Sequence, residues 1–215
     1  MCPEHGVTRP RPRTRGHLER GAWEVRCVAC DRPLEPRPTP EEKEPTPISN
    51  YGLTKLLQER LFEAAGTARG LPTAVLRFAN VYGPRQRGGP YAGVATLFAR
   101  RLAEEKPPVV HEDGRQRRDF VHVRDVVRAA LATLEATWEG ALVANVGSGE
   151  PLTVLRLAEV LGELTGSDLP PEVEGTYRLG DIRHLWFDVS RARERLGFRA
   201  TVPLDDGLRE LLQTL

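Results

Sequence analysis

A tyrosine and a lysine stand four residues apart in the segment Tyr51-Gly-Leu-Thr-Lys55. If this segment is helical, the two side chains lie on one face of the helix. An ammonium group beside a phenol favours the phenolate form, and a phenolate accepts a proton from an alcohol or sugar hydroxyl during hydride transfer. The pair therefore predicts acid–base chemistry on a hydroxyl group, although a solvated helix face also produces this spacing by chance.

Two pairs of metal-ligand residue types lie near the N-terminus, in Cys2-Pro-Glu-His5 and Cys27-Val-Ala-Cys30. Two residues separate the members of each pair, and this spacing lets short knuckles bring thiolates and an imidazole to one tetrahedral zinc ion. Four protein ligands close the coordination shell, so the pattern predicts a structural ion rather than a catalytic one. Metal binding would also supply folding free energy to a proline-rich stretch that has few core residues.

Two other interpretations of this cluster stay open. One is a flexible arm whose thiols have no common role, and the other is a nucleic-acid-binding zinc finger. Four nearby arginines favour the finger, namely Arg9, Arg11, Arg13 and Arg15. The ligand spacing and the proline content disfavour it, because they do not match the ββα finger. His17 is a spare candidate ligand if His5 is not used.

The composition narrows the class of protein. The 215 residues carry a formal net charge of +1, which disfavours nucleic acid as the main partner, because phosphate neutralisation needs a basic excess. No apolar run approaches the ~20 residues that span a bilayer, so the sequence predicts no membrane partner. Three cysteines and the lack of an apolar secretion signal predict a reduced, cytoplasmic setting.

The hydrophobic pattern changes near residue 48. Prolines crowd residues 1–47, and this stretch is therefore predicted to contain neither a long helix nor a central strand. From Ser49 onward, apolar residues recur with the periods of helices and short strands, which indicates an α/β fold. The predicted helices cover residues 50–66, 92–105, 125–136, 153–165 and the last turns from 204, with Ser49 or Asn50, Asp125 and Thr153 at their starts. The predicted strands cover residues 73–78, 109–110, 120–123 and 141–146, and residues 80–84 are predicted to form a turn.

Five motifs occur in an order that resembles the extended short-chain dehydrogenase/reductase family, and within it the NAD-dependent nucleotide-sugar epimerases and dehydratases. The motifs are Pro47-Ile-Ser-Asn-Tyr51-Gly-Leu-Thr-Lys55, Leu76-Arg-Phe-Ala-Asn80-Val-Tyr-Gly-Pro84, Asp113-Gly-Arg-Gln-Arg-Arg-Asp-Phe-Val-His-Val123, Asn145-Val-Gly-Ser-Gly149 and Arg178-Leu-Gly-Asp-Ile-Arg-His184. The resemblance covers residues 36–215. The cysteine-bearing insert before the tyrosine is similar to the insert of some bacterial dTDP-rhamnose-type 4-epimerases.

The resemblance implies an architecture for the chain. It predicts the C-terminal part of a Rossmann-like doubly wound parallel sheet, a small α/β substrate-binding domain and a Cys/His insert at the N-terminus. The insert covers residues 1–35, a remnant of the dinucleotide-binding domain with the tyrosine helix covers 36–85, and 86–215 is mainly the nucleotide-sugar-binding region. The resemblance also implies a homodimer in which the tyrosine helix and the next helix form a four-helix bundle, which the apolar faces of residues 51–62 and 92–102 permit.

The same resemblance implies roles for particular residues. Tyr51 would be the catalytic acid–base and Lys55 its activator, and both would contact the ribose side of NAD. The backbone at Phe78 and Ala79 would lie beside the nicotinamide. The residues implied to bind a nucleoside-diphosphate sugar are Asn80, Gly93, Val94, Arg118, Arg178 and Asp181.

Within this set, Arg118 would grip the diphosphate with its planar guanidinium, and Asp181 would contact ribose hydroxyls. The segment Tyr91-Ala-Gly-Val94 resembles the part of the family whose backbone approaches the nucleotide base. Two structural interpretations stay open beside these roles, because Asn80 can be an ordinary turn residue and Arg118 can be a surface arginine paired with Asp119.

The sequence departs from the family in its first part. No Gly-x-x-Gly-x-x-Gly turn for the cofactor pyrophosphate occurs, and no strand is predicted before residue 36. The upstream Ser or Thr of the family's catalytic trio and the acidic residue for the adenosine ribose have no counterpart. We therefore expect an N-terminally truncated chain, with the strand at 73–78 left exposed and weak NAD binding or none.

The expected function is that of an NAD-dependent nucleotide-sugar epimerase, which oxidises a sugar hydroxyl to a keto-sugar and reduces it from the other face. Three alternatives stay open. They are a nucleotide-sugar 4,6-dehydratase, a reductase of the same family, and a non-catalytic, zinc-containing remnant that binds nucleotide sugars.

Overall fold

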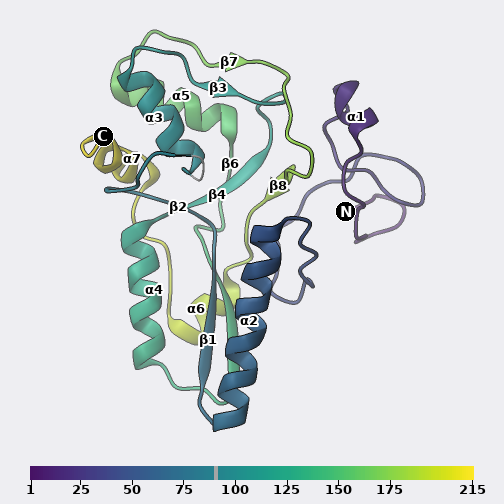
Figure 1. The fold of residues 1–215 in the computed structure, drawn as a ribbon, viewed down its shortest axis with the longest axis vertical. Helices are drawn as coiled ribbons and strands as arrows, with labels where there is room; N and C mark the ends of the chain where they lie inside the picture. The colour runs from purple at the N-terminus through teal and green to yellow at the C-terminus, as the bar shows by residue number, and fades with distance from the viewer. Residues whose placement is uncertain (90–91) are drawn as a thin grey trace.

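The computed structural model describes residues 1–89 and 92–215, and Figure 1 shows the order of its elements. The helices are α1 (Arg15–Glu19), α2 (Asn50–Arg69), α3 (Val94–Ala103), α4 (Val123–Glu135), α5 (Val154–Thr165), α6 (Ser190–Leu196) and α7 (Leu204–Leu212). The strands are β1 (Thr73–Phe78), β2 (Asn80–Tyr82), β3 (Val109–Val110), β4 (Arg117–His122), β5 (Ala141–Val146), β6 (Pro151–Thr153), β7 (Glu172–Val173) and β8 (His184–Leu185). Among the described residues, no helix has both the length and the apolar character needed to cross a membrane.

The tyrosine helix begins and ends at residues whose chemistry explains both boundaries. Ser49 is the N-cap, and its Oγ accepts a hydrogen bond from the backbone N–H of Gly52 at 3.1 Å. This bond satisfies one of the first-turn donors that a helix leaves without an intrahelical partner. Gly70 ends α2 in the left-handed conformation, with φ of 63°, a value that glycine adopts without steric cost. The predicted helix is confirmed and extends three residues further than expected.

The predicted start of α4 is wrong by three residues. His122, not Asp125, is the N-cap, and its Nδ1 accepts a hydrogen bond from the N–H of Arg124 at 3.3 Å. Asp125 instead lies fully buried in the first turn, where its carboxylate accepts the N–H groups of Thr201 at 3.2 Å and Val202 at 3.1 Å. The preference of aspartate for N-cap positions therefore gave a wrong prediction, because the Asp125 carboxylate accepts hydrogen bonds from a distant segment instead of capping α4.

The lower part of the molecule in Figure 1 is built on β1 and β5, which lie between α4 and α2. The two strands pair in parallel, in register from Thr73 with Ala141 to Phe78 with Val146. A hydrophobic cluster joins β5 to α4 and α6, and its buried members are Ala129, Leu142, Ala144, Val146, Ala192, Leu196 and Phe198. In the described part of the chain β1 pairs with β5 alone, so its second edge carries no strand there.

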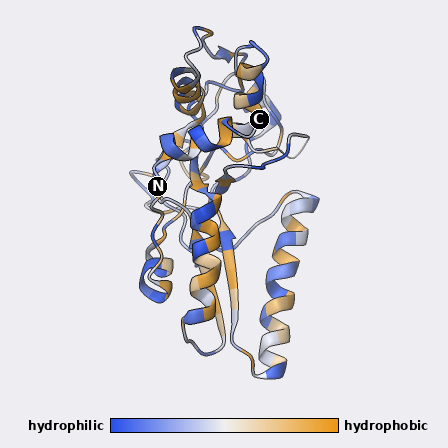
Figure 2. Ribbon diagram, turned by 90° about the vertical axis from the view of Figure 1, so that its left-hand side faces the viewer, coloured by the Kyte–Doolittle hydropathy of each residue, from blue (hydrophilic) through white to orange (hydrophobic). Residues whose placement is uncertain are grey.

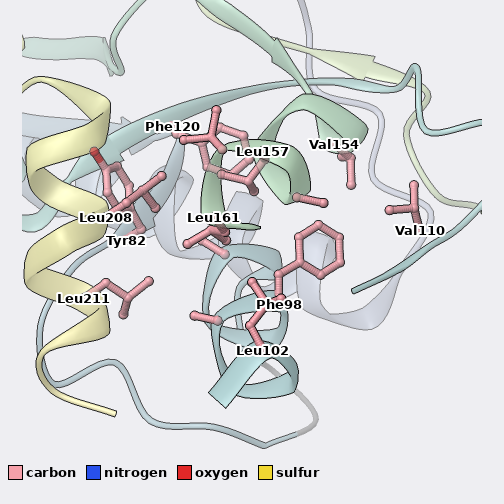
Figure 3. Packing of buried hydrophobic residues seen from close by; sticks show 14 residues of the cluster. Tyr82, Phe98, Leu102, Val110, Phe120, Val154, Leu157, Leu161, Leu208 and Leu211 are labelled. Atoms are coloured by element: carbon pink, nitrogen blue, oxygen red, sulfur yellow. The ribbon is translucent and has the colours of Figure 1, made fainter. Parts of the chain in front are cut away.

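The upper part of the molecule has a mixed sheet in the order β2-β4-β6, with β8 also paired to β4. Residues 80–82 were predicted as a turn but form β2, because they pair in parallel with β4, with Asn80 opposite Phe120. Helices α3, α5 and α7 supply a second hydrophobic cluster (Figure 3). Its larger members are Tyr82, Phe98, Leu102, Phe120, Leu157, Leu161, Leu208 and Leu211. This cluster fixes β2 and β4, which carry the candidate site residues Asn80 and Arg118.

The apolar face of α2 is largely exposed. Four of its side chains show more than half of their area to solvent, namely Leu53, Leu57, Leu61 and Phe62. Figure 2 shows hydrophobic residues recurring along this helix as well as along the long strands. Exposed apolar patches mark interaction surfaces in many proteins. The exposure agrees with the apolar face expected for residues 51–62.

An ion pair fixes α2 against β1. Glu59, 8% exposed, accepts hydrogen bonds from Arg77 Nε at 3.0 Å and Arg77 Nη2 at 2.5 Å. We predict that Glu59→Gln lowers the free energy of unfolding by about 2–4 kcal/mol, because it leaves a largely buried guanidinium without its counter-charge. The matched control is Glu63→Gln on the same helix, whose exposed partner is Arg60 and whose loss should cost under about 1 kcal/mol. Urea unfolding of both variants measures the difference, and equal losses would contradict the assignment.

Candidate functional site

The tyrosine and lysine predicted to do acid–base chemistry lie together at the start of α2. Tyr51 is 68% exposed, and the Lys55 Nζ atom lies 5.6 Å from the centroid of its ring. Lys55 Nζ also donates a hydrogen bond to Gln58 Oε1 at 3.2 Å. Both groups therefore share one helix face that is open to solvent, where a phenol and an ammonium can reach the same bound molecule.

The carboxyl ends of β1 and β5 meet beside a glycine that permits a close backbone approach. Ala79 N–H donates a hydrogen bond to the Val146 carbonyl at 2.9 Å. A methyl group on Gly147 would lie 3.1 Å from Cβ of Ala79 and 2.3 Å from Oδ2 of Asp119, so only glycine fits there. Phe78 is 46% exposed at this edge. Such an edge of a parallel sheet is where α/β folds bind ligands.

Asp119, on β4, accepts hydrogen bonds from backbone groups at this edge, although its place in the sequence suggested only a pairing with Arg118. It is 2% exposed, and its carboxylate accepts hydrogen bonds from the Ser148 N–H at 2.7 Å and the Gly149 N–H at 3.1 Å. It also accepts the N–H of Phe187 at 3.3 Å. These three backbone N–H groups thus have the Asp119 carboxylate as their hydrogen-bond acceptor, in place of a carbonyl group of a neighbouring strand. The interpretation of Arg118 as a surface arginine paired with Asp119 is wrong.

Arg118 instead reaches the loop of residues 178–185. Its Nη2 donates a hydrogen bond to the Ile182 carbonyl at 2.6 Å, and its Nη1 donates to the Arg183 carbonyl at 3.0 Å. The Asp181 carboxylate lies 3.5 Å from Nη2. Burial lowers the pKa of Arg118, while the charge of Asp181 opposes that shift. The structure therefore brings together two of the residues predicted to bind a nucleoside diphosphate.

The same loop lies beside the start of α2. A methyl group on Gly180 would lie 3.2 Å from Cδ1 of Ile48, a residue just before the N-cap of α2. Arg178 is exposed in this loop, and its carbonyl accepts the N–H of Asp181 at 3.1 Å. The fold thus places the loop of Arg178 and Asp181 next to the segment that leads into Tyr51.

The remaining predicted ligand contacts lie on β2 and at the start of α3. Asn80 is the first residue of β2 and is half-buried. Gly93 is the N-cap of α3, which begins at Val94, and a methyl group on Gly93 would meet Nε2 of Gln86 at 3.1 Å. Tyr91 lies outside the described residues. Gly93 and Val94 lie at the start of a different helix from Tyr51, and their role stays a prediction.

The cysteine and histidine side chains of the N-terminal segment converge on one point. Cys2 Sγ lies 3.6 Å from Cys30 Sγ and 3.5 Å from His5 Nδ1, and Cys27 Sγ lies 3.7 Å from His5 Nδ1. All four ligand atoms lie within 4.8 Å of one another. Zinc–sulfur bonds of about 2.3 Å and zinc–nitrogen bonds of about 2.0–2.1 Å give tetrahedral edges of roughly 3.6–3.8 Å. The four side chains therefore fit one tetrahedral ion.

Local backbone groups lower the pKa of two of these thiols. The N–H groups of Ala29 and Cys30 lower the pKa of Cys27. Burial raises the pKa of Cys2, but the N–H groups of Glu4 and His5 outweigh it, so the pKa is lowered. A lower thiol pKa favours the thiolate, which is the form that binds metal.

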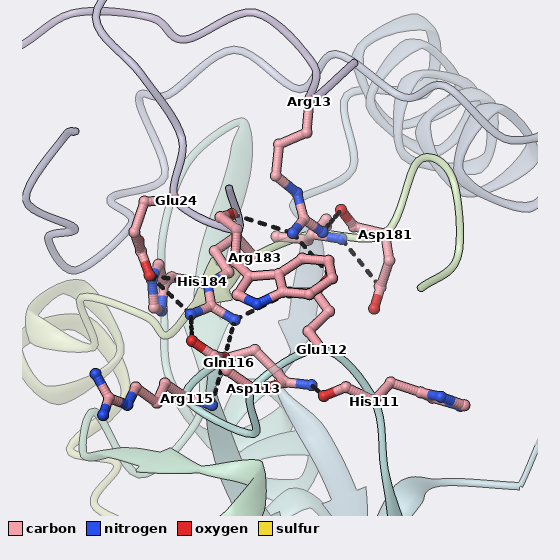
Figure 4. A network of polar contacts seen from close by, with 12 residues as sticks. Arg13, Glu24, His111, Glu112, Asp113, Arg115, Gln116, Asp181, Arg183 and His184 are labelled. Atoms are coloured by element: carbon pink, nitrogen blue, oxygen red, sulfur yellow. Dashed lines mark hydrogen bonds and ion pairs between the residues drawn. The ribbon is translucent and has the colours of Figure 1, made fainter. Parts of the chain in front are cut away.

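One polar network near the site could not have been found from sequence spacing. Figure 4 shows Arg183 between acidic side chains of distant segments. Its guanidinium contacts Glu24 at 2.7 Å, Glu112 at 2.9 Å and Asp113 at 2.7 Å. Burial raises the pKa of Glu24, but hydrogen bonds from His184 and Arg183 outweigh it and lower that pKa to about 2. The most distant partners, Glu24 and His184, are 160 positions apart in the sequence. No local motif predicts a contact over that distance.

Comparison with known proteins agrees with the motifs. The model of the NAD dependent epimerase/dehydratase family matches residues 30–147. The dTDP-L-rhamnose 4-epimerase of Burkholderia thailandensis is 35% identical over 206 residues, a match that covers 95% of this chain and 55% of that protein. The chain thus spans about half the length of the curated relatives it matches.

Solved structures share the fold. The UDP-glucose 4-epimerase of Thermotoga maritima, solved with UDP-glucose, matches with a TM-score of 0.78 and 39% identity over 84% of this chain and 58% of that chain. The UDP-glucuronic acid 4-epimerase of Bacillus cereus, solved with UDP-glucuronic acid and NAD, matches with a TM-score of 0.74 and 31% identity over 84% of this chain and 56% of that chain. The fold is therefore the expected Rossmann-like α/β fold, with a Cys/His insert at the N-terminus. Because the family model matches more than half of its residues, the chain belongs to the NAD-dependent epimerase/dehydratase family.

Proposed function

We propose that this chain supplies the tyrosine helix and the sugar-nucleotide site of an NAD-dependent nucleotide-sugar 4-epimerase. The observation that carries the proposal is the exposed Tyr51–Lys55 pair on α2. The loop of Asp181, held by Arg118, lies next to the start of that helix. The relatives and structural neighbours described above are 4-epimerases of dTDP and UDP sugars, which supports this reaction class.

The diphosphate would bind between β4 and the loop of residues 178–185. Arg118 uses Nη1 and Nη2 on three backbone carbonyls, those of Arg117, Ile182 and Arg183, and a guanidinium has five N–H groups in total. Arg118 can therefore hold the loop and still donate to a phosphate oxygen. Arg178 would add positive charge, and Asp181 would accept hydrogen bonds from ribose hydroxyls.

The other assigned contacts complete the ligand site. Asn80, on β2, would donate its amide to the sugar diphosphate. Gly93 and Val94, at the start of α3, would present their backbone to the nucleotide base. The first turn of α3 has backbone N–H groups without intrahelical partners, which suits contact with base oxygens or nitrogens.

The residues present fit the nicotinamide half of NAD. The Tyr51 hydroxyl and the Lys55 ammonium are donors that suit ribose hydroxyls, and the small residues Ala79 and Gly147 approach each other closely at the edge that carries the exposed Phe78. When bound, NAD+ accepts a hydride from the sugar carbon and gives it back. No glycine-rich pyrophosphate turn occurs in the described part of the chain, so this fit concerns only the nicotinamide side.

Tyr51 would act as the acid–base in both half-reactions. In the first, its phenolate takes the proton of the sugar C4 hydroxyl while the C4–H bond breaks, which leaves a 4-keto-sugar. Arg118 and the loop hold the diphosphate meanwhile, so the sugar can turn and present its other face. In the second, the C4–H bond forms again and Tyr51 returns the proton to the C4 oxygen. The reaction consumes no oxidant overall, and the Lys55 ammonium, 5.6 Å from the centroid of the Tyr51 ring, would supply a positive charge near the phenol.

Cys2, His5, Cys27 and Cys30 would hold a structural zinc ion. The interatomic distances and the closed four-ligand set support this proposal. The hydrophobic cluster of this segment consists of Cys2, Cys27 and Leu34, with Cys30 packed against it. A core that is mostly thiols gains its stability from metal binding.

The organisation of the whole protein follows the same assignments. Residues 1–35 would be the zinc-binding insert, 36–85 part of the dinucleotide-binding domain, and 86–215 mainly the substrate-binding region, although β5 pairs with β1. The exposed apolar face of α2 would pack against a second copy as a homodimer, whereas the apolar face expected at residues 92–102 does not take part, because most of the apolar side chains of α3 are buried in the core of this chain. Reduced thiols that hold a metal suit a cytoplasmic protein.

Product analysis tests the reaction class. We predict that the endogenous gene product, incubated with NAD+ and either dTDP-L-rhamnose or UDP-glucose, forms the C4 epimer until the two epimers reach equilibrium. Nuclear magnetic resonance of the sugar distinguishes the outcomes. Loss of water from the sugar would favour a dehydratase, and stoichiometric consumption of NADH with a keto-sugar would favour a reductase. Sugar-nucleotide binding without turnover would favour the non-catalytic binder.

A further inference from the structure

The stretch between the two metal-ligand pairs, residues 6–26, closes over the loop that carries Asp181, and we call this stretch the clasp. Both of its ends are fixed at one point, because His5 precedes it and Cys27 follows it in the same ligand cluster. Within the clasp, Leu18 is the buried hydrophobic residue. A stretch with so small a core depends on the closure of its ends for order, since closure removes conformational freedom from the disordered state.

Arg13 is the first contact of the clasp with the loop. Its Nη2 donates a hydrogen bond to the Asp181 carbonyl at 2.9 Å. Its Nη1 pairs with Glu112 Oε1 at 2.7 Å, and the two side chains are only 6% and 3% exposed. A buried guanidinium with a carboxylate partner keeps a fixed position. Arg13 is therefore a hydrogen-bond donor that is held at a fixed position beside the loop.

Two guanidinium groups hold three consecutive carbonyls of the loop. Arg13 holds that of Asp181 from the clasp, and Arg118 holds those of Ile182 and Arg183 from β4. The Asp181 side chain also pairs with Arg118 at 3.5 Å. The loop backbone is thus fixed between an arginine of the substrate-binding region and an arginine of the metal-binding segment.

Glu24, three residues before Cys27, is the second contact (Figure 4). Its Oε1 accepts hydrogen bonds from Arg183 Nη2 at 2.7 Å and Nε at 3.0 Å, and its Oε2 lies 2.9 Å from His184 Nε2. Trp23 adds a third contact, with its ring centroid 6.4 Å from that of Tyr177. The clasp therefore contacts residues 181, 183 and 184 of the loop, and also Tyr177 just before it.

We infer that a metal ion at the Cys/His cluster positions the nucleotide-diphosphate loop through Arg13 and Glu24. The inference rests on the proposed function for the identity of the ligand, but the ordering of the loop does not depend on it. Loss of the metal lets the two ends of the clasp separate. Asp181 and Arg183 then lose their contacts with the clasp, and the loop binds a diphosphate less tightly. Arg13 and Glu24 are positioning residues, because they act on the loop and not on the sugar.

Hydrogen exchange measured by mass spectrometry tests the inference on the whole chain. We expect that removal of the metal by a chelator speeds exchange in residues 178–187 by about tenfold or more, whereas β1 and β5 keep their rates. Zinc alone, added back, should restore the slow exchange. Arg13→Met should speed exchange in the same residues with the metal still bound. Arg9→Met is the matched control, because Arg9 lies in the clasp but pairs with Glu44 at an exposed position, and it should leave the loop unchanged.

Binding of UDP-glucose, followed by calorimetry, gives the second measurement. Arg13→Met should raise the Kd about tenfold or more, and Arg9→Met should not change it. Unchanged loop exchange after verified loss of the metal would overturn the inference, even if the sugar nucleotide binds well. If the metal controls loop exchange but the wild-type chain binds no sugar nucleotide, the positioning role stands and the proposed ligand is wrong.

Discussion

Replacing Tyr51 by phenylalanine is expected to lower kcat for C4 epimerisation by about 10²–10⁴-fold, the range that positioned acid–base groups contribute. The substitution removes only the phenolic oxygen from a side chain that is 68% exposed, so the free energy of unfolding should change little. The affinity for the sugar nucleotide should also stay near the wild-type value. The measurement is steady-state turnover of the endogenous gene product at saturating NAD+.

Two further variants separate chemistry from helix structure. Lys55→Met should lower kcat by about tenfold to thousandfold, because it removes the positive charge near the phenol that exchanges the proton. Arg60→Gln changes an exposed charge on the same helix, one turn or more from the pair, and should leave kcat unchanged. If Tyr51→Phe keeps full activity, Tyr51 is not the acid–base, and the proposed mechanism fails with it.

Replacing Cys27 by serine is expected to abolish tight zinc binding and to disorder residues 1–35. Structural zinc sites contribute apparent binding free energies of about 10–16 kcal/mol, and a serine hydroxyl does not replace a thiolate ligand. The rest of the chain has its own two hydrophobic clusters and should stay folded. Metal analysis and limited proteolysis measure the two effects.

Val28→Ser is the matched control for this variant. Val28 lies between the two cysteine ligands of one pair and is 53% exposed, so its replacement should keep one zinc ion per chain. Equal zinc content in Cys27→Ser and the wild type would contradict the metal site. Loss of zinc without a change in proteolysis would show that the ion does not order the segment.

Local rules predicted the elements that build the site. Ser49 before an apolar repeat indicated the start of α2, and the short, mostly apolar segment 73–78 before a turn-like stretch indicated β1. Both features act within a few residues of chain, so they are readable from the sequence. The ligand spacing of Cys2, His5, Cys27 and Cys30 is local in the same sense within each pair, and the structure brings the two pairs together.

Contacts made by polar side chains across the fold were not predictable. Asp125 has the character of a cap, but it serves the backbone of Thr201 and Val202. Arg183 and Glu24 are 159 positions apart, and no spacing rule relates residues at that distance. β2 also escaped prediction, because three residues that look like a turn become a strand only when β4 lies beside them.

Isotope labelling of the substrate tests the central claim most directly. The claim is that the C4 hydrogen leaves and returns within one site, with Tyr51 moving only the hydroxyl proton. UDP-glucose and dTDP-L-rhamnose with deuterium at C4, incubated in ordinary water with the endogenous protein and NAD+, should yield C4 epimers that retain the deuterium. Replacement of that deuterium by hydrogen from water, or no inversion at C4 of either sugar, would contradict the account.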